Sequence, residues 1–249
     1  GLIPPLVLRA TYIEAHGLAV AGGFEAAQLL AQSYMAVLFA GLTAHVLPGL
    51  AACRTPAERT RLLSDAVEAL ALVGALAVTL LLGFEPWVLR ILFSAETSGP
   101  AHGPLRWMLL ADYLRIVGWC YGILMIAVDD RIGWVALDSL AVAVLTLGAL
   151  AVPAHADAGG IAFLAQQAIY VPLVVARGVS RHGIALERRA LGAWALGAAS
   201  VGGMAWAGWP ERAAPDGQTL AICALAALPP AWGLARRWAM VIPKAGNPT

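Results

Sequence analysis

The chain has 249 residues, of which 60% are hydrophobic and only 12% are charged. Soluble domains carry about 25% charged residues, and a water-soluble globule of this length could not bury so much apolar surface. The net charge of +1 gives no reason to expect nucleic acid as a partner. The three cysteines form no CxxC pair, so we expect no disulfide framework, no metal site and no cofactor. The composition indicates an integral membrane protein whose surroundings are a lipid bilayer.

Apolar segments alternate with short polar breaks along the whole chain. They are longer than the 9–11 residues of a barrel strand and lack its alternation, so the predicted class is an all-α integral membrane protein. The expected spans are a truncated one ending near Ile13 and residues 20–50, 66–83, 104–128, 134–152, 160–176, 190–209 and 219–235. This is a helical bundle of about eight transmembrane segments. Because the first is too short to cross a bilayer, we expect a fragment of a longer protein.

Two further segments of the chain have a predicted place. Residues 84–93 mix charged and bulky apolar side chains, which predicts a segment lying along the outer membrane surface. The tail from Pro243 onward is polar and short, and we expect it to be disordered.

Basic residues are distributed unevenly between alternate breaks. One set carries eleven: Arg54, Arg59, Arg61, Arg131, Arg177, Arg181, Arg188, Arg189, Arg236, Arg237 and Lys244. The opposite set carries three: Arg90, Arg106 and Arg212. By the positive-inside rule, the first set is cytoplasmic and the chain ends in the cytoplasm.

The first group of candidate functional residues lies in the predicted span 104–128. Asp112 and Arg115 are three residues apart and share a helix face, and Trp119 continues that face. Ionisable residues in a membrane helix are costly unless they face a cavity or a partner. The pair either lines a path for an anion or a proton, or it neutralises itself and holds helices together. Gly118 and Gly122 form a GxxxG pattern, which predicts a close contact with another helix.

The second group is a polar stripe on the predicted span 20–50. Glu25, Gln28 and Gln32 recur at helical spacing on one face of this otherwise apolar segment. Such a stripe faces either a water-filled path or another helix. Gln166, Gln167 and Tyr170 are weaker candidates, for which hydrogen bonding between helices is the preferred interpretation.

The chain resembles the polysaccharide (O-antigen, lipid-linked oligosaccharide) flippases of the multidrug/oligosaccharidyl-lipid/polysaccharide exporter superfamily. The residues that carry the resemblance are Ile91-Leu92-Phe93-Ser94, Leu105-Arg106-Trp107, Ala111-Asp112, Arg115, Gly118-Trp119, Gly122 and Leu124. Ala111 stands where this pattern often has glycine, and Arg115 stands where it often has lysine. A looser similarity covers Leu8-Arg9, Gly22-Gly23-Phe24, Ala26, Tyr34 and Leu47-Pro48. Together the resemblance extends over roughly residues 8–180.

The resemblance implies the C-terminal lobe of a two-lobe transporter, with the N-terminal lobe missing. Residues 1–180 would correspond to helices seven to twelve, and residues 181–249 would add a transmembrane helix pair and a cytoplasmic tail. Such a protein moves an undecaprenyl-diphosphate-linked glycan across the bacterial inner membrane by alternating access, coupled to H⁺ or Na⁺. By this analogy the substrate- or ion-binding residues are Arg9, Glu25, Gln28, Gln32, Asp112, Arg115 and Trp119. No catalytic residue is implied, and we expect no enzyme activity.

Three alternatives remain. A drug/cation antiporter of the same superfamily would share the fold and use a membrane-buried acid. A membrane-embedded polyprenyl-phosphate glycosyltransferase would need clustered acids at one membrane edge, where Asp129 and Asp130 are the candidates. A structural membrane module would have no transport activity.

Overall fold

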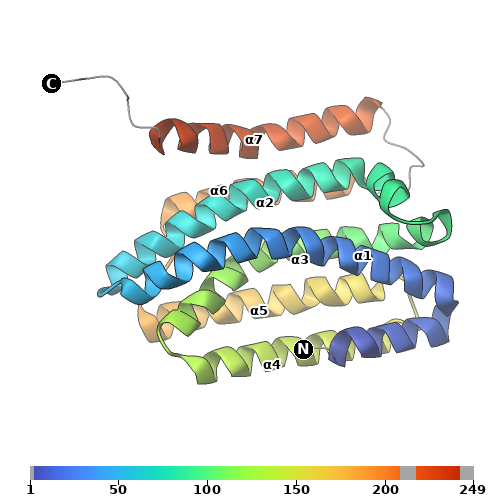
Figure 1. The fold of residues 1–249 in the computed structure, drawn as a ribbon, viewed down its shortest axis with the longest axis horizontal. Helices are drawn as coiled ribbons and strands as arrows, with labels where there is room; N and C mark the ends of the chain where they lie inside the picture. The colour runs from blue at the N-terminus through green and yellow to red at the C-terminus, as the bar shows by residue number, and fades with distance from the viewer. Residues whose placement is uncertain (1–2, 208–216, 242–249) are drawn as a thin grey trace.

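A computed structural model describes residues 3–207 and 217–241 of the chain (Figure 1). Within these residues all regular structure is helical, which confirms the all-helical class. The helices are α1 (Ile3–Ala52), α2 (Pro56–Leu92), α3 (Ala95–Ala127), α4 (Arg131–Gly148), the 3-10 turn η1 (Ala149–Ala151), α5 (Ala158–His182), α6 (Arg188–Ala207) and α7 (Gly217–Val241). The predicted end of a span at Trp209 and the tail from Pro243 lie outside the described residues.

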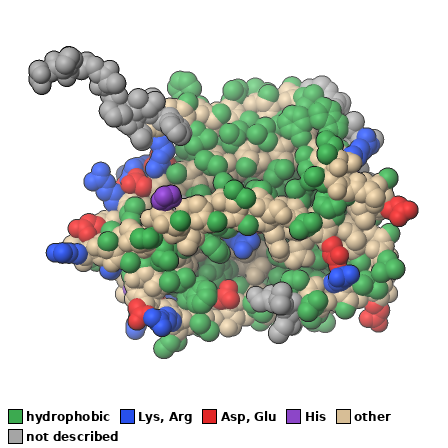
Figure 2. Space-filling view, in the orientation of Figure 1, with side chains coloured by type: hydrophobic (Ala, Val, Ile, Leu, Met, Phe, Trp, Pro, Cys, Tyr) green, Lys and Arg blue, Asp and Glu red, His purple; other side chains and the backbone are tan. Residues whose placement is uncertain are grey.

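The described helices have the length and character of membrane spans. Five are long and apolar enough to cross a membrane, and the bent α1 brings the number to six if it counts as one span. Figure 2 shows most charged side chains towards the two ends of the bundle, with a largely apolar surface between them that a few charged side chains interrupt. These are the features of a multi-pass membrane protein. The sequence predicts about eight crossings, a number that includes both arms of α1 and the shorter α6.

A sharp break divides α1 into two arms. Gly17 has φ 82° and ψ 177°, outside the helical region and in a conformation that residues with a Cβ rarely adopt. The chain reverses direction there, so residues 3–16 run back along the following arm (Figure 1). The sequence predicts a break in the same place, between Ile13 and residue 20.

The junctions between helices are sorted by charge. Figure 1 shows the α1–α2, α3–α4 and α5–α6 junctions at one end of the bundle, together with the end of α7. These junctions and the end of α7 carry the ten arginines of the Arg-rich set, whereas its Lys244 lies outside the described residues. The α2–α3 and α4–α5 junctions lie at the opposite end. The helices therefore alternate in direction as the charge pattern requires.

Residues 84–93 form the last part of α2, which continues through them to Leu92 with Pro86 inside the helix. Their expected place along the outer membrane surface stays a prediction. Glu85 is only 1% exposed and accepts hydrogen bonds from Arg106 Nε at 2.9 Å and His102 Nδ1 at 3.1 Å. Two basic side chains of α3 offset the free-energy cost of burying this carboxylate. No pattern within residues 84–93 predicts these partners.

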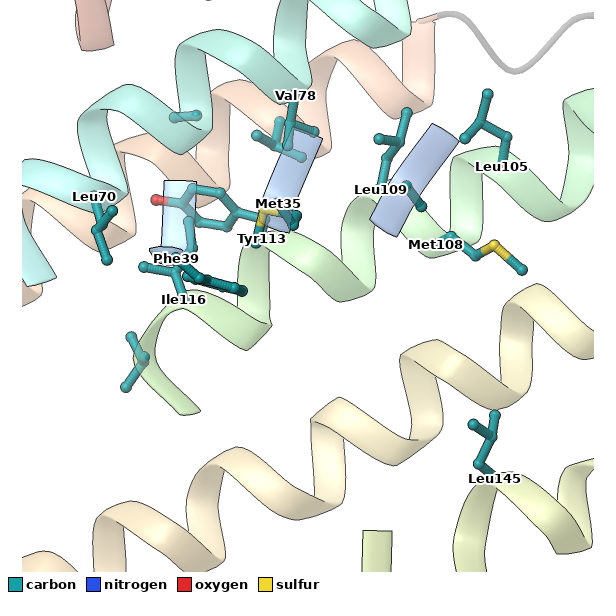
Figure 3. Packing of buried hydrophobic residues seen from close by; sticks show 14 of the residues in the cluster. Met35, Phe39, Leu70, Val78, Leu105, Met108, Leu109, Tyr113, Ile116 and Leu145 are labelled. Atoms are coloured by element: carbon teal, nitrogen blue, oxygen red, sulfur yellow. The ribbon is translucent and has the colours of Figure 1, made fainter. Parts of the chain in front are cut away.

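Helix α3 lies at the centre of the bundle and contacts α1, α2 and α5. Figure 3 shows Tyr113 and Ile116 of α3 packed among Met35 and Phe39 of α1 and Leu70 of α2. All five side chains belong to the buried core, with exposed fractions between 1% and 7%. The core therefore forms around α3, which presents buried side chains on most of its faces.

Glycines let α5 approach α3 closely. A Cβ on Gly118 would lie 3.1 Å from the Tyr170 ring, and one on Gly160 would lie 2.6 Å from the Pro104 carbonyl oxygen. Small residues at a membrane-helix interface allow backbones to come together where lipid offers no hydrophobic driving force. The GxxxG prediction thus corresponds to the α3–α5 contact.

We expect the substitution Gly160→Ala to destabilise the protein by about 1–3 kcal/mol, because the new methyl group would press on backbone atoms of α3 that have no room to move. The measurement is thermal unfolding of the purified protein in detergent micelles. The matched control is Gly192→Ala in α6, where a Cβ meets nothing within 4 Å and alanine favours the helix. Equal melting temperatures for the two variants would contradict the close α3–α5 contact.

Candidate functional site

The polar stripe of α1 and the charged face of α3 meet at one cavity of about 300 Å³. Five of the seven predicted site residues line it: Gln28, Gln32, Asp112, Arg115 and Trp119. Helices α4 and α5 close the other side with Trp134, Asp138, Phe163, Gln166, Gln167 and Tyr170. The polar faces of α1 and α3 therefore border one shared cavity.

The register between α1 and α3 is held by a close contact at Gly23. A Cβ at this position would lie 2.6 Å from Pro100 Cβ and 2.9 Å from the Ala101 backbone nitrogen. Only glycine allows the two helices to come this close. Beyond this contact, the α1 glutamines lie opposite the polar turn of α3.

Asp112 is buried and has two partners. Asp112 is only 7% exposed, and its Oδ2 accepts a hydrogen bond from the Tyr34 hydroxyl at 3.0 Å. Arg115 Nη1 lies 3.8 Å from Oδ1, one turn further along α3. At this distance the two groups form an ion pair but are too far apart for a hydrogen bond. The carboxylate is therefore held by Tyr34 and only loosely by Arg115.

Arg115 lies against aromatic rings. Its guanidinium carbon is 5.6 Å from the centre of the Phe39 ring and 5.9 Å from that of Trp119. These rings stack on each other, with centroids 4.6 Å apart and planes 12° apart. A cation near aromatic faces gains electrostatic stabilisation in a desolvated site. Since Arg115 makes no hydrogen bond to another residue in the part of the chain that the structure describes, its donors are free for a ligand.

A second, more open hollow of about 700 Å³ continues from the first. The two share Gln32, Arg115 and Trp119. Small side chains of α1 border the second hollow at Ala36, Ala40 and Ala44. Figure 2 shows a depression in the middle of this face with basic side-chain atoms at its floor. The cavity is therefore accessible from one broad face of the bundle.

The other two predicted site residues, Arg9 and Glu25, do not line the first cavity. Instead Arg9 Nε pairs with Glu25 Oε1 at 2.6 Å, with side chains that are 56% and 41% exposed. The pair joins the two arms of α1 across the reversal at Gly17. Helical periodicity predicts that Glu25 lies on the same face as Gln28. Arg9 lies beside Glu25 because the chain reverses direction at Gly17.

Several residues of the site are not among the predicted site residues. Tyr34, which does not line the cavity but donates a hydrogen bond to Asp112, has no sequence signal except the loose family similarity. Gln166, Gln167 and Tyr170 were assigned to contacts between helices, and they line the cavity from α5. The only sequence signal for the last of these is the GxxxG face of α3, which Tyr170 contacts.

Asp129 and Asp130, the acids of the glycosyltransferase alternative, are each engaged by a basic side chain. Asp129 pairs with Arg131 at 2.6 Å. Both Asp130 oxygens accept hydrogen bonds from Arg177, at 2.7 Å each, and Oδ2 also lies 3.0 Å from His182 Nε2. Among the described residues, no three His, Cys, Asp or Glu side chains are placed to share a metal ion. This arrangement fastens the α3–α4 junction to the end of α5.

Arg177 hydrogen bonds hold the pKa of the Asp130 carboxyl well below its usual range, with smaller contributions from His182 and the Gly133 N–H. A carboxyl whose pKa is depressed on folding stabilises the protein above its unfolded pKa, near 3.9, and this stabilisation is lost as the pH falls through the folded pKa.

We expect Asp130→Asn to lower the free energy of unfolding by about 1 kcal/mol at pH 7, because the charge-assisted hydrogen bonds are lost while the helix cap is kept. Thermal unfolding measured from pH 7 down to pH 3 should show the wild type and the variant converging below about pH 4. A difference that stays constant across this range would show that the carboxylate charge is not what stabilises the junction.

Comparisons of the chain with protein-family models, with curated proteins and with solved structures give no match. The cavity and its charges are therefore the features that a functional hypothesis has to explain.

Proposed function

We propose that this chain is the C-terminal lobe of a membrane transporter that flips a polyprenyl-diphosphate-linked oligosaccharide across the bacterial inner membrane. In this proposal residues 1–180 form the lobe and residues 181–249 add a helix pair and a cytoplasmic tail. The two arms of α1 and the six following helices make eight crossings, with the first one truncated. A second lobe completes the translocation path, and an H⁺ or Na⁺ gradient drives it.

The observation that carries the proposal is the loosely paired Arg115 in the wall of a membrane-depth cavity. A guanidinium at this depth costs free energy unless it meets an anion or water. Its ion-pair partner, Asp112, lies 3.8 Å away, and Arg115 lines both hollows together with Gln32 and Trp119. A diphosphate is an anion that a guanidinium recognises with two parallel hydrogen bonds.

The rest of the cavity supports a substrate with an uncharged polar part. Gln28, Gln32, Gln166 and Gln167 offer amide donors and acceptors without charge. Trp119 and Trp134 add aromatic surface with an N–H donor each. This mixture suits the hydroxyl groups and ring faces of a sugar, and the broad opening leaves the lipid tail in the bilayer.

The alternatives fit less well. A cation antiporter would use Asp112 as its buried acid, but Arg115 beside it disfavours a cationic substrate in the same cavity. A glycosyltransferase would use Asp129 and Asp130, and both of these already pair with arginines. An assay showing sugar transfer by the protein would overturn the proposal.

We expect Asp112→Asn and Arg115→Gln each to reduce flipping by tenfold or more, since one removes the carboxylate held by Tyr34 and the other removes the anion site. The protein from its complete reading frame is reconstituted in vesicles with a fluorescent polyprenyl-diphosphate-linked N-acetylglucosamine. Accessibility of the fluorophore to external dithionite then reports movement between leaflets. Membrane insertion of both variants should be normal.

The charge-matched control is Arg90→Gln, because Arg90 is exposed and lies outside the cavity. It should flip at the wild-type rate. Normal flipping by both Asp112→Asn and Arg115→Gln would reduce the pair to a packing role. A wild-type protein that exports ethidium but does not flip the glycolipid would favour the antiporter.

The proposed orientation places the Arg-rich end of the bundle in the cytoplasm. Cys53, a partly exposed residue at this end, should therefore not react with an impermeant maleimide added to intact spheroplasts, and should react after permeabilisation. Ala154→Cys, exposed at the α4–α5 junction, should react in intact spheroplasts and serves as the positive control. Cys120 and Cys223 are buried and give little background. Labelling of Cys53 in intact spheroplasts would invert the topology.

A further inference from the structure

The end of the first cavity enclosed by α3, α4 and α5 differs from the end at Arg115. Its floor is Gly122, which has no side chain to fill the space. Trp134 Nε1 of α4 and the Tyr170 hydroxyl of α5 lie 3.9 Å and 3.6 Å from where a Cβ on Gly122 would be. Two hydrogen-bonding groups from two helices thus lie within 4 Å of the position that a Gly122 side chain would occupy.

Two further polar atoms in the cavity wall are buried without a partner. Gln167 is 8% exposed, and its Oε1 has no hydrogen-bond partner in residues 3–207 and 217–241. Trp119 Nε1 is likewise buried and without a hydrogen-bond partner in those ranges. Leaving such groups unsatisfied costs free energy. Both atoms are themselves closed to solvent, so the groups at this end that can reach a ligand without rearrangement are Trp134 Nε1 and the Tyr170 hydroxyl.

The chemistry of this end indicates the class of ligand. Indole N–H, phenol and amide groups donate and accept hydrogen bonds, and the Asp138 carboxylate of α4 in the same lining adds an acceptor for hydroxyl groups. The Trp119, Trp134 and Tyr170 rings supply flat apolar surface beside them. The whole first cavity, with its Arg115 end included, measures about 300 Å³, the lower end of the range of about 300–1,000 Å³ for ligand pockets, so it holds one ring rather than a chain of rings.

We infer that Gly122, Trp134, Gln167 and Tyr170, together with Trp119, form a subsite for a single uncharged, hydroxyl-rich ring, that is, one pyranose. We call these residues the Gly122 subsite. The position of the diphosphate at Arg115 rests on the proposed function. If the diphosphate binds there, the ring in the Gly122 subsite is the sugar directly attached to it. The subsite then discriminates among first sugars, while later sugars extend into the open hollow.

The test compares two probes that differ only in this ring. Binding of farnesyl diphosphate and of farnesyl-diphosphate-linked N-acetylglucosamine to the full protein in nanodiscs is measured by microscale thermophoresis. The wild type should bind the glycosylated probe about tenfold more tightly or better, because each satisfied buried group adds affinity. Gln167→Leu and Tyr170→Phe should each abolish most of this difference and leave the affinity for farnesyl diphosphate unchanged.

The matched control on the same helix is Ile169→Ala, since Ile169 is 44% exposed and lies outside the cavity. It should bind both probes as the wild type does. Tyr170→Phe removes one oxygen only and keeps the packing against Gly118, so its effect is separable from misfolding. If both subsite variants keep the wild-type preference, or weaken both probes equally, the inference is overturned.

Failure of the proposed function has a different signature. Arg115→Gln should weaken both probes alike if Arg115 binds the diphosphate. If neither probe binds the wild type, the flippase proposal fails and the Gly122 subsite is tested by itself. Saturation-transfer NMR with millimolar methyl pyranosides, including methyl N-acetyl-β-glucosaminide, should then show transfer that Gln167→Leu abolishes. No transfer from any of these sugars would overturn the subsite.

Discussion

Keeping a charged turn of α3 out of contact with lipid is the constraint on which the rest of the structure depends. Asp112 and Arg115 lie in a helix of a bundle whose middle is apolar, where unpaired charges are costly. The bundle meets this cost by surrounding α3 with α1, α2 and α5 and by directing the charged face into a cavity. The position and the polarity of the site thus both follow from the free-energy cost of exposing Asp112 and Arg115 to lipid.

Two charged clusters outside the cavity, around Glu85 and Asp130, are paired much more tightly than Asp112 and Arg115. Glu85 accepts a hydrogen bond from Arg106 at 2.9 Å, and Asp130 accepts two from Arg177 at 2.7 Å. These clusters lie where α2 meets α3 and where the α3–α4 junction meets α5, and they hold helices to one another. The 3.8 Å separation of Asp112 and Arg115 contrasts with them. A loosely paired cation in a cavity wall is available to a ligand, whereas tightly paired charges serve the fold.

Glycine sets the shape of the cavity as much as the charges do. Gly23 brings α1 against the start of α3, and Gly118 brings α5 against its middle. Gly122, one turn further on, leaves the space over which Trp134 and Tyr170 converge. Two close contacts between helices and one glycine in the cavity lining therefore shape the cavity, since a side chain at any of the three positions would alter the distance between helices or take up space in the cavity.

The sequence by itself determined the all-helical membrane class, the break near Gly17 and the uneven distribution of basic residues between the two ends of the bundle. It also determined that Gln28, Gln32, Asp112, Arg115 and Trp119 lie on polar helix faces. These are consequences of composition and helical periodicity, which act within one segment. Only the tertiary structure decided which faces meet. Arg9 pairs with Glu25 because the chain reverses, Glu85 is buried because α3 supplies two basic partners, and Gln167 faces the cavity because α5 packs on glycines of α3. Each of these depends on contacts between segments, which periodicity within a segment does not encode.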